Sequence, residues 1–316
     1  MLKITPENVF KFKTAKVFKD NEKRINSIDI SSDGELLLTS SDDESLQLYN
    51  TQTGKHLKTV YARRNGVDQA IFTHARETVL VASSSGWDHS IRYLSLYDNR
   101  YLRYFKGHRD KVNSISLCPK SDLFLSSSND GTVRLWDLNT NVCQGLMSSP
   151  RFKPGRVAFD TEGLIFAVAG SMSTIKLFDV QLYQRGPFAS FTVPSKGLSF
   201  DWTRIEFSND GKMMLLSTSN QIILILNAYN GDVMQTLRAP GVLADEATFT
   251  PDGQFVLCGS LDGTIYCWSS SSGQILHQWK QGTKGVGPIR WNPMTMMFAS
   301  ADTSLYFWLP DVQPHE

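Results

Sequence analysis

The stretch from residue 107 to residue 137 decides the fold and reads GHRDKVNSISLCPKSDLFLSSSNDGTVRLWD. Apolar residues recur in three short runs, which begin at Val112, Leu123 and Thr132. Turns rich in Gly, Asp and Pro separate these runs. Short alternating segments between such turns are typical of antiparallel strands rather than helices. This stretch therefore predicts one small antiparallel sheet.

The same unit recurs along the chain. Aligned on Trp136, the equivalent positions are Tyr49, Leu94, Phe178, Leu226, Trp268 and Trp308. Five of the seven units carry an aspartate six residues before this position: Asp43, Asp88, Asp130, Asp262 and Asp302. A unit of this length with G-H near its start and W-D at its end resembles a WD40 repeat, which folds as one four-stranded propeller blade.

We therefore expect an all-β chain that forms a single seven-bladed WD40 β-propeller over residues 1–316. Its blades begin near residues 25, 67, 112, 155, 202, 246 and 287. Too few residues follow Trp308 to complete the last blade, so we predict the segment 12–18 as the outer strand of that blade. Pairing the two ends of the chain closes the ring and removes two exposed sheet edges.

Composition excludes several other classes. Hydrophobic residues make up 41% of the chain, which argues against disorder. The 32 Lys and Arg balance the 31 Asp and Glu, so no overall charge attracts the chain to nucleic acid or membranes. The longest apolar runs, such as residues 222–226, are far shorter than the ~20 residues of a membrane span. The four cysteines form no C-x-x-C pair, so we expect reduced thiols and no zinc. We expect no metal, cofactor or membrane partner.

The clearest repeat also carries the residue types of a Ser-His-Asp site. In a WD40 blade these positions instead form a buried hydrogen-bond chain that ties the inter-blade loop to the middle strands. No oxyanion site, nucleotide-binding motif or metal-binding motif accompanies them. We therefore assign His108, Ser127, Asp130 and Trp136 to a structural hydrogen-bond network and expect no enzymatic activity.

Basic residues are concentrated in three of the loops that join the outer strand of one blade to the inner strand of the next. These loops all lie on one side of a propeller, which we call the top face. The basic sector comprises Arg63, Arg64, Lys106, Arg109, Lys111, Arg151 and Lys153, with Trp87 at its rim. Such clusters attract acidic or phosphorylated peptides or a nucleic-acid backbone. Ordinary charged surface loops give the same pattern, so the ligand stays open at this point.

Two segments carry a more particular resemblance. The run IRYLSLYDN at residues 91–99, with YLRYF at 101–105, and the run CQGLM at 143–147 are similar to one small family. That family is the WD40 subunit shared by COMPASS-type histone lysine methyltransferase complexes and by transcription-termination complexes that contain protein phosphatase 1. The resemblance extends from about residue 15 to residue 310.

This resemblance implies a nuclear, non-enzymatic adaptor. Its implied partners are the N-terminal region of the methyltransferase catalytic subunit, the phosphorylated C-terminal tail of RNA polymerase II, and phosphatase scaffold or cleavage and polyadenylation subunits. We expect no direct sequence-specific binding of nucleic acid, and the basic sector would receive the phosphorylated tail. The alternatives are a generic WD40 scaffold or a substrate receptor of a cullin-type ubiquitin ligase. Such receptors usually carry W-D-x-R, whereas residues 136–139 read WDLN.

Overall fold

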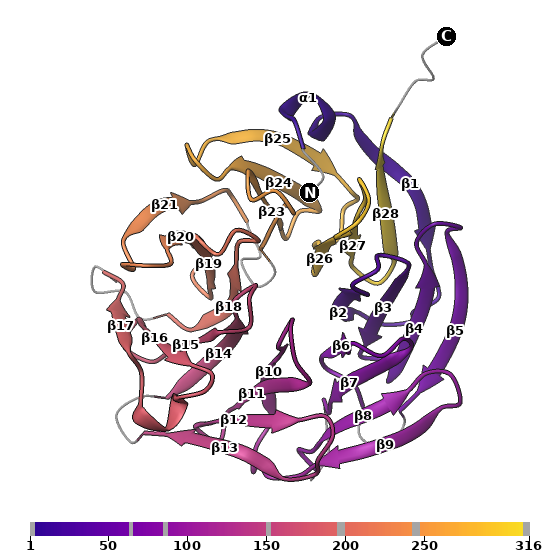
Figure 1. The fold of residues 1–316 in the computed structure, drawn as a ribbon. Helices are drawn as coiled ribbons and strands as arrows, with labels where there is room; N and C mark the ends of the chain where they lie inside the picture. The colour runs from indigo at the N-terminus through magenta and orange to yellow at the C-terminus, as the bar shows by residue number, and fades with distance from the viewer. Residues whose placement is uncertain are drawn as a thin grey trace.

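The computed structural model describes residues 4–62, 66–84, 88–149, 153–194, 200–241 and 247–311. Seven four-stranded antiparallel sheets stand around a central axis (Figure 1). The predicted seven-bladed β-propeller is confirmed. Within the described residues, no helix is long and apolar enough to cross a membrane.

The first three blades each use four consecutive strands, listed from the central axis outward. Blade 1 contains β2 (Ile25–Ile30), β3 (Leu36–Ser41), β4 (Ser45–Asn50) and β5 (Lys55–Tyr61). Blade 2 contains β6 (Ala70–Phe72), β7 (Thr78–Ala82), β8 (Ile91–Ser95) and β9 (Arg100–Phe105). Blade 3 contains β10 (Val112–Leu117), β11 (Leu123–Ser128), β12 (Thr132–Asp137) and β13 (Cys143–Ser148).

The next three blades repeat this order. Blade 4 contains β14 (Pro154–Phe159), β15 (Ile165–Gly170), β16 (Thr174–Asp179) and β17 (Ala189–Thr192), with the short 3-10 helix η1 (Tyr183–Arg185) before its outer strand. Blade 5 contains β18 (Trp202–Phe207), β19 (Met213–Thr218), β20 (Ile223–Asn227) and β21 (Val233–Leu237). Blade 6 contains β22 (Thr248–Phe249), β23 (Phe255–Gly259), β24 (Thr264–Ser269) and β25 (Ile275–Lys280).

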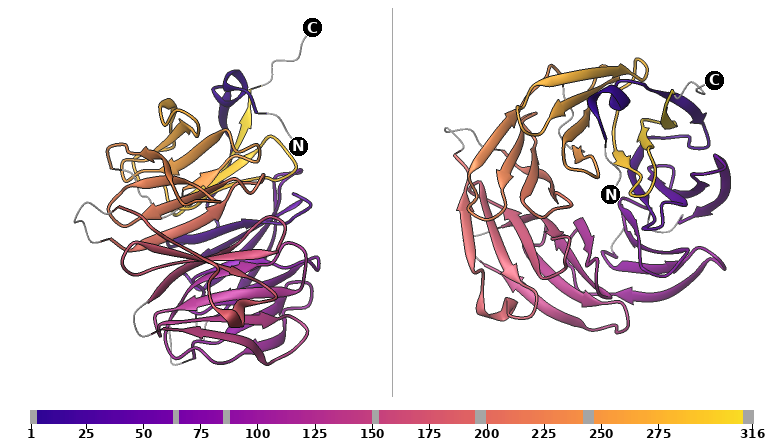
Figure 2. Two further views of the ribbon diagram at one scale, coloured as in Figure 1. Left: turned by 60° about the vertical axis from the view of Figure 1, so that its left-hand side comes forward. Right: turned by 45° about the horizontal axis from the view of Figure 1, so that its top comes forward.

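Blade 7 joins both ends of the chain. It contains β26 (Ile289–Trp291), β27 (Phe298–Ala301), β28 (Leu305–Pro310) and, as its outer strand, β1 (Phe12–Phe18). The register runs antiparallel from Phe12 opposite Pro310 to Phe18 opposite Leu305. The turned views in Figure 2 show the indigo start of the chain beside its yellow end. The predicted closure by an N-terminal outer strand is confirmed.

The residues before β1 brace the closure. Helix α1 (Pro6–Val9) follows Ile4, and both Ile4 and Val9 are buried with Trp279 and Trp291 of blades 6 and 7. The backbone N–H of Ile4 also donates a hydrogen bond to a carboxylate oxygen of Asp252, at 3.0 Å. This segment therefore anchors the closing strand to two blades through buried apolar contacts.

Polar side chains on the inner strands link neighbouring blades around the central channel. Asp29 accepts from the backbone N–H of Phe72 at 2.7 Å, and Glu206 accepts from that of Phe249 at 3.1 Å. Ser116 accepts from the N–H of Phe159 at the same relative position. Because the inner strands of adjacent blades do not pair as one sheet, these bonds satisfy N–H groups that would otherwise lack partners.

Candidate functional site on the top face

The hydrogen-bond chain of blade 3 runs from the core to the top face. The indole N–H of Trp136 donates to the hydroxyl of Ser126 at 2.8 Å, and that hydroxyl lies 2.7 Å from Nε2 of His108. Nδ1 of His108 lies 2.9 Å from a carboxylate oxygen of Asp130. Because the ionised Asp130 carboxylate can only accept, Nδ1 carries the ring proton, and in the neutral ring Nε2 is then an acceptor to which the Ser126 hydroxyl donates.

The serine of this chain is Ser126, so the prediction of Ser127 is wrong by one position. Neighbouring side chains on a strand point to opposite faces of the sheet. Ser127 therefore points away from Trp136, and its hydroxyl lies within hydrogen-bond distance of two acceptors instead, Oδ1 of Asn113 at 2.6 Å and the carbonyl oxygen of Gly155 at 3.0 Å. Its hydroxyl links blade 3 to blade 4 rather than the loop to the core.

The protonation states match this assignment. Burial lowers the pKa of His108 by more than the neighbouring Asp130 carboxylate raises it, so the ring is neutral at pH 7. Partial burial opposes ionisation of Asp130, but hydrogen bonds from the Thr132 side chain, the Arg109 N–H and His108 outweigh it and hold the pKa at about 2. His108 therefore fixes the geometry of the loop, and all the groups of this chain are satisfied within it.

The recurrent aspartates have the same local role in five blades. In each, a carboxylate oxygen accepts a hydrogen bond from the backbone N–H two residues later, which fixes the turn between the second and third strands. The five aspartates are Asp43, Asp88, Asp130, Asp262 and Asp302. Their carboxylates are therefore engaged in hydrogen bonds within these turns.

Four of the predicted basic-sector residues are described. Lys106, Arg109 and Lys153 are exposed, and their charged groups make no ion pair with another described residue. Lys111 lies 2.9 Å from Asp68, which partly neutralises it. Arg63, Arg64, Trp87 and Arg151 lie outside the described residues, so the structure does not place them.

Only some residues of the basic sector lie at the mouth of the central channel. Lys111 and Lys153 line a cavity of about 640 Å³ there, whereas Lys106 and Arg109 do not. Arg24 and Arg156, which the sequence reasoning did not select, line the same cavity. Both residues lie at the starts of inner strands, where side chains meet at the axis, and this position could have identified them from the sequence. The mouth also contains Asp68 and Asp201, so its charge is mixed with a basic excess.

The other end of the channel holds charged groups that the sequence reasoning also missed. Arg204 lies 2.6 Å from Glu206, and Arg290 lines the same small cavity of about 230 Å³. Burial raises the pKa of nearby Asp29, while the charges of Arg290 and Arg204 lower it. Glu206 also accepts from the hydroxyl of Thr248 at 3.0 Å. These residues tie inner strands together. In the sequence, the i, i+2 spacing of Arg204 and Glu206 on one strand could have indicated that the two side chains lie on the same face.

The described residues provide no metal centre: no three His, Cys, Asp or Glu side chains among them converge on one point. The four cysteines are free thiols, and three of them are buried. Burial raises the pKa of the Cys267 thiol to about 12, which keeps it protonated and unreactive.

Seven four-stranded blades, the Trp-Ser-His-Asp chain and the closing strand define a WD40-repeat propeller. The family described as WD domain, G-beta repeat matches residues 12–50, 99–137 and 235–269. The chain is 41% identical to "WD repeat-containing protein 82" of Drosophila melanogaster over 98% of each chain. It is 35% identical to "COMPASS component SWD2" of Saccharomyces cerevisiae, also over 98% of each chain. It is 38% identical to "Set1 complex component swd2" of Schizosaccharomyces pombe over 75% of this chain and 64% of that protein.

The chain therefore belongs to the family of WD repeat-containing protein 82 and SWD2. The resemblance to a COMPASS-type WD40 subunit, predicted from residues 91–105 and 143–147, is confirmed.

Proposed function

We propose that this protein is a non-catalytic adaptor subunit of a nuclear COMPASS-type chromatin complex. It tethers a histone lysine methyltransferase, through the N-terminal region of that enzyme, to the phosphorylated C-terminal tail of RNA polymerase II. The relatives named as COMPASS and Set1 complex components support the first part of this proposal. In a second assembly, the same disc joins phosphatase scaffold or cleavage and polyadenylation subunits at termination.

One observation carries the tail-binding part. Lys106, Arg109 and Lys153 present charged groups on the top face without an ion-pair partner among the described residues. Two carboxylates lie beside Arg109: Asp130 is held by internal hydrogen bonds, and the exposed Asp110 accepts from the backbone N–H of Lys111 at 2.6 Å. A phosphoserine carries close to two negative charges near neutral pH and three acceptor oxygens, which suits such donors.

The direct test is binding of a serine-phosphorylated peptide from the polymerase tail, followed by fluorescence anisotropy. We expect Lys153→Glu and the double variant Arg109→Glu/Lys111→Glu each to weaken binding. Each charge reversal should cost about 1–1.4 kcal/mol, or roughly fivefold to tenfold in Kd. The matched control is Lys120→Glu, because Lys120 is exposed in the turn between β10 and β11, on the opposite face. Equal affinity for the phosphorylated and unphosphorylated peptides would contradict the proposal.

The methyltransferase and phosphatase parts need a separate measurement. Affinity purification of the tagged chain from nuclear extract, followed by mass spectrometry, should recover methyltransferase subunits and phosphatase scaffold subunits. Recovery of cullin adaptors or coat proteins in their place would instead favour one of the alternative scaffold functions.

A further inference from the structure

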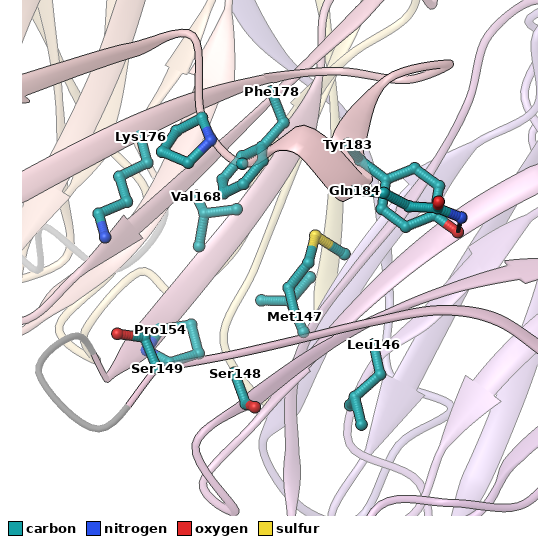
Figure 3. A pocket seen from close by; sticks show the side chains of 13 residues that line it. Leu146, Met147, Ser148, Ser149, Pro154, Val168, Lys176, Phe178, Tyr183 and Gln184 are labelled. Atoms are coloured by element: carbon teal, nitrogen blue, oxygen red, sulfur yellow. Dashed lines mark hydrogen bonds between the residues drawn. The ribbon is translucent and has the colours of Figure 1, made fainter.

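A groove of about 520 Å³ opens on the rim of the disc between blades 3 and 4. One wall is Leu146 and Met147 of β13, and the other is Tyr183 and the turn after it. Its floor is Val168 and Phe178 of blade 4, which belong to the hydrophobic core between the two blades. Figure 3 shows the Met147 side chain between Phe178 and Tyr183. The groove has the size of pockets that bind small ligands, roughly 300–1,000 Å³.

The sequence explains why this seam is open. Met147 lies opposite Val133 of the third strand, at the register that Phe105, Leu237 and Trp279 occupy in blades 2, 5 and 6. Those three side chains are buried, as is Phe18 at this register in blade 7, whereas Met147 is half-buried, like Val60 of blade 1 and Phe191 of blade 4. The outer strand of blade 4, β17, is also only four residues long. A slender side chain and a short strand leave the core between blades 3 and 4 accessible from the rim.

The far wall of the groove is held in place by specific contacts. The hydroxyl of Tyr183 donates to the carbonyl of Gln144 at 2.7 Å, which fixes η1 against the edge of β13. Gly145 permits this approach, because a Cβ there would lie 2.5 Å from the Tyr183 ring. At a separation below about 3 Å the ring or the strand would have to shift, so glycine leaves room for the ring where it lies. The groove is therefore a defined feature of the fold rather than a loosely packed seam.

The groove and the channel mouth share one lining residue. Pro154 lines both cavities, and Lys153, immediately before it, lines the mouth. The described residues that line the groove include Lys176 and no carboxylate. A segment that runs from the top face onto the rim therefore passes from exposed cationic groups to exposed apolar ones. This arrangement complements a segment with an anionic group followed by an apolar side chain.

We propose that the groove binds a large apolar or aromatic side chain of an extended phosphorylated segment whose phosphoryl group lies at Lys153. The proposal rests on the proposed function and adds a second contact to it. An extended chain advances about 3.3 Å per residue, so a side chain two to four residues from the phosphoserine lies roughly 7–13 Å along the chain from it, and the test covers this range. Phosphate contacts at the mouth position the segment, and the groove selects among phosphorylated segments by the neighbouring side chain.

The test uses synthetic phosphoserine peptides with tyrosine two, three or four residues from the phosphoserine, and matched peptides with alanine in its place. Binding to the full chain is measured by fluorescence anisotropy. We expect at least one tyrosine peptide to bind at least fivefold more tightly than its alanine match. Leu146→Ala and the groove-filling Met147→Trp should each remove that preference, whereas Lys153→Glu should weaken both peptides of a pair.

Two controls keep the outcomes distinct. Val142→Ala removes an exposed apolar side chain just before β13 that does not line the groove, and should change nothing. Leu146 is itself 55% exposed, so Leu146→Ala tests the groove even if Met147→Trp fails to fold. Phosphate-dependent binding with equal affinity for tyrosine and alanine peptides would overturn the groove proposal and leave the proposed function intact. No phosphate-dependent binding by the wild-type chain would overturn both.

Discussion

The Ser126→Ala substitution tests the assignment of the blade 3 network most sharply. Ser126 is fully buried, and its hydroxyl is the acceptor for Trp136 and the hydrogen-bond partner of Nε2 of His108. The substitution leaves two buried polar groups without partners. At about 1–3 kcal/mol for each unsatisfied group, the expected loss in the free energy of unfolding is about 2–6 kcal/mol.

The neighbouring Ser127→Ala substitution is the matched control. It removes an identical hydroxyl, but its two partners, Asn113 and Gly155, are half-buried and line the channel mouth, where water can replace the lost bond. We expect a loss of about 1 kcal/mol. Equilibrium urea unfolding of both variants, followed by tryptophan fluorescence and circular dichroism, measures the difference. Equal losses for the two variants, or a larger loss for Ser127→Ala, would refute the assignment of Ser126 to the network.

Three other predictions concern pH, a close contact and ring closure. Because burial lowers the pKa of His108, its side chain binds a proton more readily in the unfolded chain, and the free energy of unfolding should fall as pH drops below about 6.5. Urea unfolding at pH 7.5 and 5.5 should show a smaller change in that free energy for His108→Asn than for wild type. Gly145→Ala should lower the free energy of unfolding, measured in urea, by about 1–3 kcal/mol because the new Cβ meets the Tyr183 ring. The control Gly282→Ala, whose Cβ would have no atom within 4 Å, should lower it by less than about 1 kcal/mol, and similar losses would argue against the close approach. Phe12→Ala removes a buried closing-strand ring and should cost about 3–5 kcal/mol; a thermal melt unchanged from wild type would argue against closure by β1.

The sequence was sufficient for the architecture because each blade repeats a local pattern. The anchor at Trp136, its equivalents and the aspartate six residues before them fix the strand order without any long-range information. The closing strand 12–18 followed from counting strands in the last blade. The inner strands of blades 2, 6 and 7 are short and begin two or three residues later than predicted, at Ala70, Thr248 and Ile289. A period of about 42 residues does not resolve boundaries that closely.

The site was less predictable, for physical reasons. Ser126 and Ser127 are distinguished only by which face of the sheet each occupies, and a bulge between Val112 and Ser114 shifts the pairing of β10 with β11. The groove depends on how Met147 and Tyr183 from different blades pack, which no local pattern encodes. Of the predicted basic sector, Lys111 and Lys153 line one cavity at the channel mouth, and the binding role of the sector stays a prediction.

Photo-crosslinking tests the central claim, that the top face of this propeller receives a phosphorylated tail, most directly. A polymerase-tail peptide with phosphoserine and a neighbouring photoreactive residue is crosslinked to the full chain, and the attachment sites are mapped by mass spectrometry. We expect them within residues 106–111 and 153–156, and competition by the unlabelled phosphopeptide but not by its unphosphorylated form. Attachment concentrated on the opposite face, around Lys120 and the turn between β18 and β19, would contradict the account.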